Sequence, residues 1–261
     1  MPTLTASEAR SILTPQKGGA LRGRYSYTLN PYRGCAFGCS YCYAKGFTHD
    51  PVLEASWGGW VQAKLNAPEL LCREAGRLAG ARVFMSSATD PYQPAERQHR
   101  LSRACLQVML SMLPGPELLT IHTRSPYVLD DLDLLREFGE RVQVAMSVTT
   151  DDDRVRRIFE PHAPSIPRRL ETLRALGDSG VTTRASVSPV LPSAPYQLAR
   201  LVGEVTNRAF VDAVRFPSQQ GYGLELYRSH SLMSYLLPEH TEAVALALRE
   251  ELGEENVSSR A

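Results

Sequence analysis

Short apolar runs alternate with longer amphipathic stretches along most of this chain, and this alternation constrains its fold more than any other feature. We expect strands over 25–29, 82–85, 118–122, 142–148, 181–187 and 210–216. Helices are predicted over 67–78, 95–113, 128–138, 166–176, 195–207 and 239–252, with Asn66 as the cap of the first. Strands that alternate with helices of this length indicate right-handed βαβ units and a parallel sheet.

The number of these units predicts an α/β fold with a partial, open β/α barrel. About six βα units are present, whereas a closed barrel of eight units usually takes roughly 250 residues. An N-terminal arm and a long cysteine loop use part of the 261 residues of this chain. We expect residues 1–23 to form a loose basic arm and residues 24–261 to form one domain with a C-terminal helix. Functional side chains should gather at the carboxyl ends of the strands.

The composition argues against several classes of protein. Lys and Arg total 29 and Asp and Glu total 28, so the formal charge of +1 does not favour a generic polyanion binder. No stretch reaches the roughly 18 apolar residues that span a bilayer, and the N-terminus lacks the apolar core of a signal peptide. We therefore expect a cytoplasmic protein without membrane contact. Three of the five cysteines lie within 35–42, which points to metal binding or catalysis rather than to a disulfide scaffold.

The clustered cysteines form the pattern C-x3-C-x2-C, made by Cys35, Cys39 and Cys42, with Gly34 and Gly38 beside them. Thiolates are soft ligands that suit iron–sulfur clusters, zinc or Cu(I). Glycines let the backbone curl so that the three sulfurs can converge. A four-iron cluster normally takes four cysteines. Three thiolates would therefore leave one iron open to bind a small molecule.

A structural zinc site is the alternative for this loop, with His49 as its fourth ligand. Zinc sites more often use paired C-x2-C knuckles, and a second knuckle is absent from the sequence. The other two cysteines, Cys72 and Cys105, lie in helical patterns, where we expect buried structural thiols. The spacing therefore favours the open cluster over zinc.

The pattern C-x3-C-x-aromatic-C, with Tyr41 as the aromatic residue, resembles the signature of the radical SAM superfamily. NPYRGCAFGCSYCYA at 30–44, KLNAPELL at 64–71 and SATDPYQP at 87–94 are similar to the spore photoproduct lyase-like branch, a resemblance that covers about 25–217. It implies a [4Fe–4S] cluster whose open iron chelates S-adenosylmethionine. It also implies an enzyme that cleaves this cofactor reductively, giving methionine and a 5′-deoxyadenosyl radical that acts on an unidentified substrate.

The resemblance also assigns residues that hold S-adenosylmethionine. Thr89 is expected at its amino group and Arg124 at its carboxylate, for which a guanidinium offers a bidentate fork. Ser147 matches the position that holds the ribose, and the backbone of Ser188 approaches the adenosine. Tyr41 is expected to flank the adenine. The alternatives are a turn residue for Thr89, a surface charge for Arg124 and a strand-end hydroxyl for Ser147.

One departure from the lyase concerns hydrogen donation. Ser87 stands where the lyase carries the cysteine that returns a hydrogen atom to the product radical. A serine O–H bond is stronger than a thiol S–H bond, so photoproduct repair by the same route is not expected. Tyr43 matches a tyrosine of that relay and is the candidate catalytic residue, with packing beside the cluster as its alternative.

Partners follow from the resemblance as well. It implies a reductant such as flavodoxin or ferredoxin and ranks a nucleic acid-related substrate first, although the near-neutral charge argues mildly against nucleic acid. A non-catalytic zinc or iron–sulfur binding module is the second hypothesis. Outside these motifs, Glu160 is expected to form a surface ion pair with Arg168 or Arg169. Trp57 and Trp60 are expected to be packing residues, with covering the cluster or touching a base as the alternatives.

Overall fold

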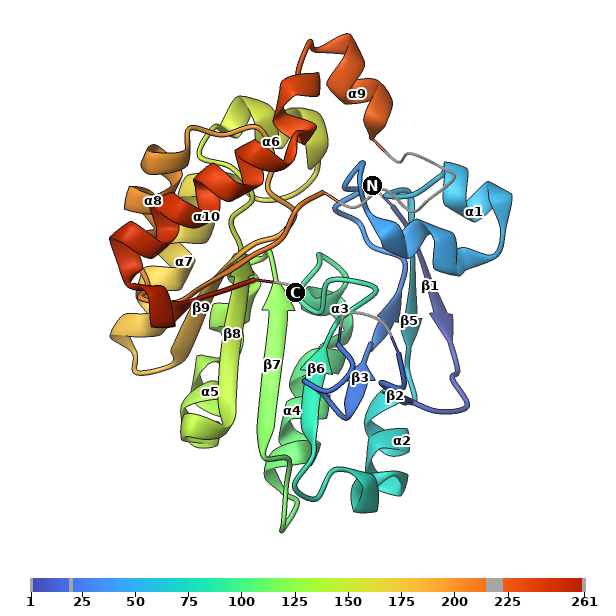
Figure 1. Cartoon of the computed structure of the whole chain (residues 1–261). Helices are drawn as coiled ribbons and strands as arrows, with labels where there is room; N and C mark the ends of the chain where they lie inside the picture. Colours follow the sequence, from blue (N-terminus) through green and yellow to red (C-terminus); the bar gives the residue numbers. More distant parts are fainter. Residues whose placement is uncertain (1, 19–20, 215–222, 260–261) are drawn as a thin grey trace. The chain divides into compact units, whose positions relative to one another are not determined.

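The computed structural model of this chain describes residues 2–18, 21–214 and 223–259. They carry two sheets with accompanying helices (Figure 1). The chain divides into two compact units. Unit 1 comprises Met1–Ala36, Ala44–Val144 and Ser179–Thr182, and unit 2 comprises Phe37–Tyr43, Ala145–Asp178 and Thr183–Ala261.

Unit 1 contains the smaller sheet and the N-terminal strands of the larger one. Its strands are β1 (Thr3–Ser7), β2 (Leu13–Pro15), β3 (Tyr27–Leu29), β4 (Tyr32–Arg33), β5 (Trp60–Lys64), β6 (Arg82–Met85) and β7 (Leu118–Thr123). Its helices are α1 (Pro51–Ala55), α2 (Ala67–Arg73), η2 (Ala75–Arg77), α3 (Glu96–His99), α4 (Leu101–Leu110), η3 (Pro126–Asp131), α5 (Leu132–Phe138) and η4 (Gly139–Arg141). Strands β3, β6 and β7 pair in parallel, with Leu29 opposite Met85 and Met85 opposite Ile121. Their carboxyl ends therefore lie at one edge, where a parallel sheet presents its loops.

Unit 2 contains the remaining strands and the C-terminal helices. Strand β8 (Val142–Ser147) ends in it, and β9 (Thr182–Val187), β10 (Ala209–Val211) and β11 (Val257–Ser259) follow. The helices are α6 (Asp153–Phe159), α7 (Ile166–Asp178), α8 (Pro195–Gly203), α9 (Leu224–Ser229), η5 (Met233–Leu236), α10 (Pro238–Leu252) and η6 (Glu254–Asn256). Strands β9, β10 and β11 pair in parallel. Helix α10 packs along α8 (Figure 1), and the buried side chains of Val202 and Leu248 belong to these two helices.

The strand order confirms the α/β fold with a mostly parallel sheet. The larger sheet has eight strands in the order β11-β10-β9-β8-β7-β6-β3-β2, and the smaller has the order β1-β5-β4. Within the described residues β2 and β11 are the outer strands of the larger sheet, so its order does not close. The six predicted strands correspond to β3, β6, β7, β8, β9 and β10. The last of these ends at Val211, and positions 215–216 of the prediction lie outside the described residues.

In the described part of the segment predicted as a loose arm, two stretches are strands. Strand β1 pairs in parallel with β5, and β2 pairs antiparallel with β3. Ile12 and Leu13 are buried. Asn66 contributes to the same attachment: its side chain caps no helix N–H but bonds the backbone N–H and C=O of Ala9, each at 2.9 Å. Pairing of backbone groups and burial of apolar side chains order this segment. The single domain over 24–261 stays a prediction.

The helix predicted over 95–113 is broken at Arg100, whose φ is 50°, so that α3 and α4 are separate. The cause is the carboxylate of Glu96, which accepts the backbone N–H groups of Ser102 at 3.0 Å and Arg103 at 3.1 Å. It also accepts the hydroxyl of Tyr32. Glu96 thus supplies the acceptor that the first turn of α4 lacks within the helix. Burial raises the pKa of the Glu96 carboxyl, and these hydrogen bonds oppose the rise.

We predict that Glu96→Ala destabilises the fold, because it leaves buried donors on α4 and Tyr32 without their acceptor. The free energy of unfolding should fall by about 2–4 kcal/mol in urea titrations of the apo chain. The control is Glu69→Ala, which removes an exposed pair with Arg73 on α2 and should cost about 0.5 kcal/mol or less. Equal losses in the two variants would contradict the capping role of Glu96.

Candidate functional site

The cysteine loop presents three thiols that belong to no disulfide. Cys35 and Cys39 are buried and Cys42 is half-buried. Cys35 belongs to unit 1, whereas Cys39 and Cys42 belong to unit 2, where the N–H of Cys42 donates to the C=O of Cys39 at 3.2 Å. Gly34 and Gly38 have φ of 76° and 61°, the left-handed conformation that favours glycine. Reduced thiols on a loop curled in this way fit the donor set of an iron–sulfur cluster.

Metal ligation by this loop stays a prediction. In the part of the chain that the structure describes, no group of three or more His, Cys, Asp and Glu side chains is placed so that it could hold a metal ion. This holds for the three thiols and for the zinc alternative with His49 alike. The other two cysteines differ from each other: Cys105 is fully buried in α4, as expected, but Cys72 is exposed on α2. Burial raises the pKa of the Cys105 thiol, which is inert in such surroundings.

Gly34 lies directly against Trp60. A Cβ atom at Gly34 would be 2.6 Å from two ring carbons of Trp60 and 2.7 Å from its backbone oxygen. The indole N–H of Trp60 donates to the C=O of Leu53 at 2.8 Å, and its ring meets Trp57 edge to face at 5.9 Å. The structure therefore supports interior packing for Trp60. Glycine is required at position 34 by its φ and by this close approach.

A buried amide holds the backbone on each side of Cys35. Gln93 is fully buried, and its side-chain oxygen accepts the N–H of Ala36 at 2.8 Å. Its NH₂ donates to the C=O of Gly34 at 3.3 Å and to the hydroxyl of Thr89 at 2.9 Å. Thr89 in turn donates to the same C=O at 2.6 Å. The loop after β6 thereby fixes the backbone that carries Cys35.

The hydroxyl of Thr89 can accept one further hydrogen bond, as the role predicted for it requires. Its hydroxyl donates once and accepts once in these contacts, which leaves one oxygen lone pair for another donor. Gln93 could not be singled out from the sequence, because a lone Gln in a proline-containing turn carries no distinctive signal. Ser87 lies beside Asn30, whose side-chain NH₂ donates to the Ser87 hydroxyl at 3.4 Å.

Asp90 joins the loop after β6 to the end of β7. Its buried carboxylate accepts the hydroxyl of Thr123 at 2.7 Å and the N–H groups of Arg124 at 2.8 Å and Tyr92 at 3.0 Å. Burial raises the pKa of the Asp90 carboxyl, and these three hydrogen bonds oppose the rise. The same carboxylate fixes the backbone of Arg124. Thr89 and Arg124 are thus held in one hydrogen-bonded framework in unit 1.

In unit 2, Tyr41 belongs to a buried network centred on Glu160. The Glu160 carboxylate accepts the hydroxyls of Tyr41 and of Thr149, the latter at 3.1 Å, and pairs with the guanidinium of Arg169. Arg169 also donates to the C=O of Ser147 at 3.1 Å. The side chains of Glu160 and Arg169 are fully buried, so the predicted surface ion pair is wrong. A buried pair needs additional hydrogen bonds for its remaining donors and acceptors, and these partners supply them.

Ser188 and Tyr43 lie at more open positions. Ser188 directly follows β9 and is half-buried. The ends of β8 and β9 are joined by the N–H of Val148, which donates to the C=O of Ser186 at 3.0 Å. Tyr43 begins the helix η1 (Tyr43–Thr48), and its side chain is exposed. The functional roles of both residues stay predictions.

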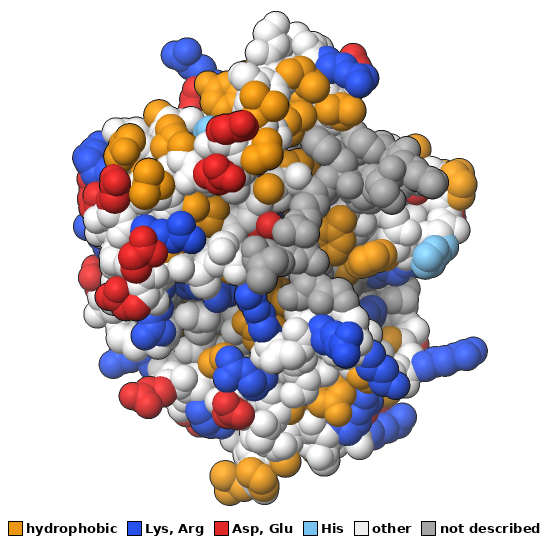
Figure 2. Space-filling model, in the orientation of Figure 1, with side chains coloured by type: hydrophobic (Ala, Val, Ile, Leu, Met, Phe, Trp, Pro, Cys, Tyr) orange, Lys and Arg blue, Asp and Glu red, His pale blue; other side chains and the backbone are white. Residues whose placement is uncertain are grey.

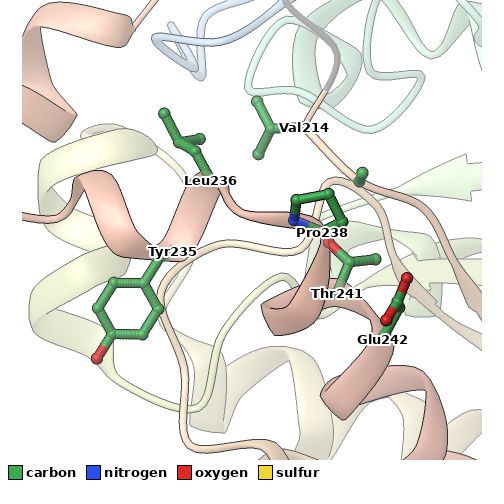
Figure 3. A pocket seen from close by; sticks show the side chains of 7 residues that line it. Val214, Tyr235, Leu236, Pro238, Thr241 and Glu242 are labelled. Atoms are coloured by element: carbon green, nitrogen blue, oxygen red, sulfur yellow. The ribbon is translucent and has the colours of Figure 1, made fainter.

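A pocket of about 370 Å³ lies in unit 2 (Figure 3). Val214 lines it from the segment after β10, and the other labelled side chains come from η5 and α10, as Figure 3 shows. Its lining is mainly apolar, with the carboxylate of Glu242 as its charged group. The volume lies in the range of small-molecule sites. None of the predicted site residues lines it.

The charged side chains of the chain nearly balance, with a formal charge of +1. On the face in Figure 2, acidic and basic side chains are interspersed, and Lys and Arg are frequent over the part that holds β2 and α2. Among the described residues, no helix is both long enough and apolar enough to cross a membrane.

We predict that Gly34→Ala disrupts the cysteine loop, because the added methyl group would meet Trp60 in a backbone conformation that disfavours alanine. The free energy of unfolding should fall by about 2–4 kcal/mol. Gly76→Ala is the matched control, since a Cβ atom there meets nothing within 4 Å. Urea titration of both variants provides the measurement, and a Gly34→Ala variant as stable as the control would refute the packing argument.

Three relatives resemble this chain in sequence. An uncharacterized protein of Methanocaldococcus jannaschii is 32% identical over 166 residues, which cover 64% of this chain and 61% of that protein. An uncharacterized protein of Acidianus two-tailed virus is 30% identical over 237 residues, covering 87% and 76%. One of Mycobacterium tuberculosis is 30% identical over 192 residues, covering 69% and 55%. The matches to the first and third proteins thus span less than two thirds of their lengths.

Solved structures show the same fold. A spore photoproduct lyase variant matches with a TM-score of 0.67 at 15% identity, over 99% of this chain and 82% of the lyase. Another variant, with bound AdoMet and dinucleoside spore photoproduct, matches with a TM-score of 0.69 at 14% identity over the same shares. The model of the radical SAM superfamily matches residues 29–198, which include the cysteine loop and the ends of β6 to β9. This chain belongs to the radical SAM superfamily, whose enzymes use a [4Fe–4S] cluster and S-adenosylmethionine.

Proposed function

We propose that this chain is an enzyme that holds a [4Fe–4S] cluster on Cys35, Cys39 and Cys42 and cleaves S-adenosylmethionine reductively. The observation that carries the proposal is the loop itself: three cysteines that belong to no disulfide stand at C-x3-C-x2-C spacing on a backbone curled by left-handed glycines, within the superfamily match. When bound, the cluster supplies the electron that splits the cofactor into methionine and a 5′-deoxyadenosyl radical, which takes a hydrogen atom from the substrate.

Thr89 and Arg124 would bind the methionine end of the cofactor. The remaining lone pair of the Thr89 hydroxyl can accept a hydrogen bond from the amino group. The Arg124 guanidinium can pair with the carboxylate through two parallel hydrogen bonds. Thr89 is bonded to the backbone next to Cys35, and the backbone of Arg124 is held by Asp90. These contacts support a role for both residues, because they fix Thr89 next to the cysteine loop and the backbone of Arg124 at the end of β7.

Ser147, Ser188 and Tyr41 would bind the adenosine end. Ser147 ends β8 and Ser188 follows β9, and these strand ends are joined through Val148 and Ser186. We assign the ribose to Ser147 and a backbone contact with the adenosine to Ser188. The buried hydroxyl of Tyr41 is bonded to Glu160, which restrains the ring that we expect beside the adenine.

The reaction on the substrate involves Tyr43 in this proposal. Its exposed side chain can reach a bound molecule, and a phenol is a better hydrogen-atom donor than the serine at position 87. We propose a nucleic acid-related substrate, because the chain shares its fold with a lyase whose structure holds a dinucleoside. A small electron carrier such as flavodoxin or ferredoxin would supply the reductant. Reduced thiols favour a cytoplasmic location.

We predict that Cys39→Ala abolishes the activity, because two thiolates cannot hold the cluster in place of three. Protein reconstituted without oxygen should bind about four irons per chain. It should form 5′-deoxyadenosine when dithionite and S-adenosylmethionine are added. The variant should lose most of its iron and at least about 99% of this product, since ligand loss removes the redox centre. Cys72→Ala is the matched control, because Cys72 is exposed on α2.

Two outcomes would contradict the proposal. One is a Cys39→Ala variant that keeps both its iron and its product formation. The other is wild-type protein that binds one zinc per chain and shows no iron–sulfur absorbance, which would indicate the non-catalytic module instead.

A further inference from the structure

We propose that Glu160 is a positioning residue that fixes the cluster-binding segment Cys39–Cys42 relative to the ribose-binding end of β8. This inference rests on the proposed function. Glu160 accepts the hydroxyl of Tyr41, one of the two residues between Cys39 and Cys42. It also pairs with Arg169, which bonds the C=O of Ser147. One buried carboxylate thus links the two places where the cofactor is expected to be held within unit 2.

The backbone strengthens this link. The N–H of Ser40 donates to the C=O of Phe159 at 2.8 Å, so that two successive residues of the cysteine segment bond two successive residues at the end of α6. The ring of Phe159 packs against Tyr227 with centroids 4.6 Å apart. Arg156 donates to the C=O groups of Glu160 at 3.4 Å and of Ala163 at 3.1 Å. The end of α6 is therefore held by several contacts and can serve as a rigid support.

The chemistry of the hydrogen-bond network around Glu160 indicates a positioning role in addition to any contribution to stability. Burying a charged pair costs desolvation energy that its attraction often fails to offset, so apolar residues would stabilise the same place at least as well. A carboxylate with several hydrogen-bond partners instead fixes the positions of these partners relative to one another. Each hydrogen bond is strong only over a narrow range of distance and angle. All three guanidinium nitrogens of Arg169 donate hydrogen bonds. Besides those to Glu160 and Ser147, one goes to the C=O of Pro164 at 2.9 Å.

A cofactor that is chelated at the cluster and bonded at its ribose must meet both groups at once. If the segment Cys39–Cys42 moved relative to Ser147, one of the two contacts would weaken even though every ligand remained. Removing the Tyr41 hydroxyl should therefore leave cluster assembly intact while weakening the binding of S-adenosylmethionine. A merely structural role would instead lower stability and leave cofactor binding unchanged.

The test compares Tyr41→Phe with Tyr92→Phe in the full chain, reconstituted without oxygen. The control removes the same atom from another buried tyrosine, whose hydroxyl donates to the carboxylate of Asp131 at 3.0 Å in unit 1. Three quantities are measured: iron per chain, the Kd of S-adenosylmethionine from its effect on the electron paramagnetic resonance spectrum of the reduced cluster, and amide hydrogen exchange of residues 37–43 in the cluster-free chain.

We expect both variants to bind as much iron as the wild type. Tyr41→Phe should raise the Kd by about tenfold, the order expected for loss of a hydrogen bond to a charged group. Its 37–43 segment should exchange faster. Tyr92→Phe should change the Kd by less than about twofold, because it removes only a hydroxyl bonded to Asp131 and leaves the backbone N–H of Tyr92 on Asp90 in place. Arg169→Lys, which loses the planar fork, should also raise the Kd, and the double variant should raise it by less than the product of the single effects.

The inference is overturned if Tyr41→Phe leaves the Kd and the exchange of 37–43 unchanged. It is also overturned if the effects of Tyr41→Phe and Arg169→Lys on the Kd simply multiply, because they would then act independently. Failure of the proposed function would give a different result in the same experiment. The wild-type protein would then bind no cluster, or its spectrum would not respond to S-adenosylmethionine.

Discussion

The cysteine loop depends on buried polar side chains that hold its backbone, and the proposed site depends on that loop. In unit 1 the amide of Gln93 bonds the residues on both sides of Cys35. In unit 2 the carboxylate of Glu160 bonds the hydroxyl of Tyr41. Such groups are costly to bury unless every donor and acceptor is satisfied, so their presence defines one arrangement of the loop rather than adding general stability.

The same side chains connect the loop to the strand ends that should bind the cofactor. Thr89 and Gln93 follow β6, and Asp90 extends this framework to Arg124 after β7. Glu160 and Arg169 extend the second framework to Ser147 at the end of β8. A parallel sheet brings loops to one edge, but it does not fix their side chains. Here the buried hydrogen bonds supply that second level of order, which radical chemistry needs in order to exclude side reactions.

The fold and the cysteine motif could be predicted from sequence because each has a local signal. Apolar periodicity located β6 to β9 within a residue or two, and C-x3-C-x2-C identified the superfamily. The break at Arg100 could not be predicted from the helical pattern. It depends on the carboxylate of Glu96, which that pattern treats as an ordinary residue of the first helical turn. The buried pair of Glu160 and Arg169 was missed for a similar reason: charge spacing shows that two residues can pair but not whether they are buried. Strands β1 and β2 lie in a polar segment whose order comes from pairing with distant residues.

Mössbauer spectroscopy of protein reconstituted with ⁵⁷Fe is the decisive measurement of cluster binding by the cysteine loop, because it distinguishes irons by their ligands. We expect a [4Fe–4S] cluster in which one iron lacks a cysteine ligand. The signal of that iron alone should shift when S-adenosylmethionine is added. A cluster with four equivalent, thiolate-bound irons whose spectrum does not respond to the cofactor would rule out an open iron on this loop.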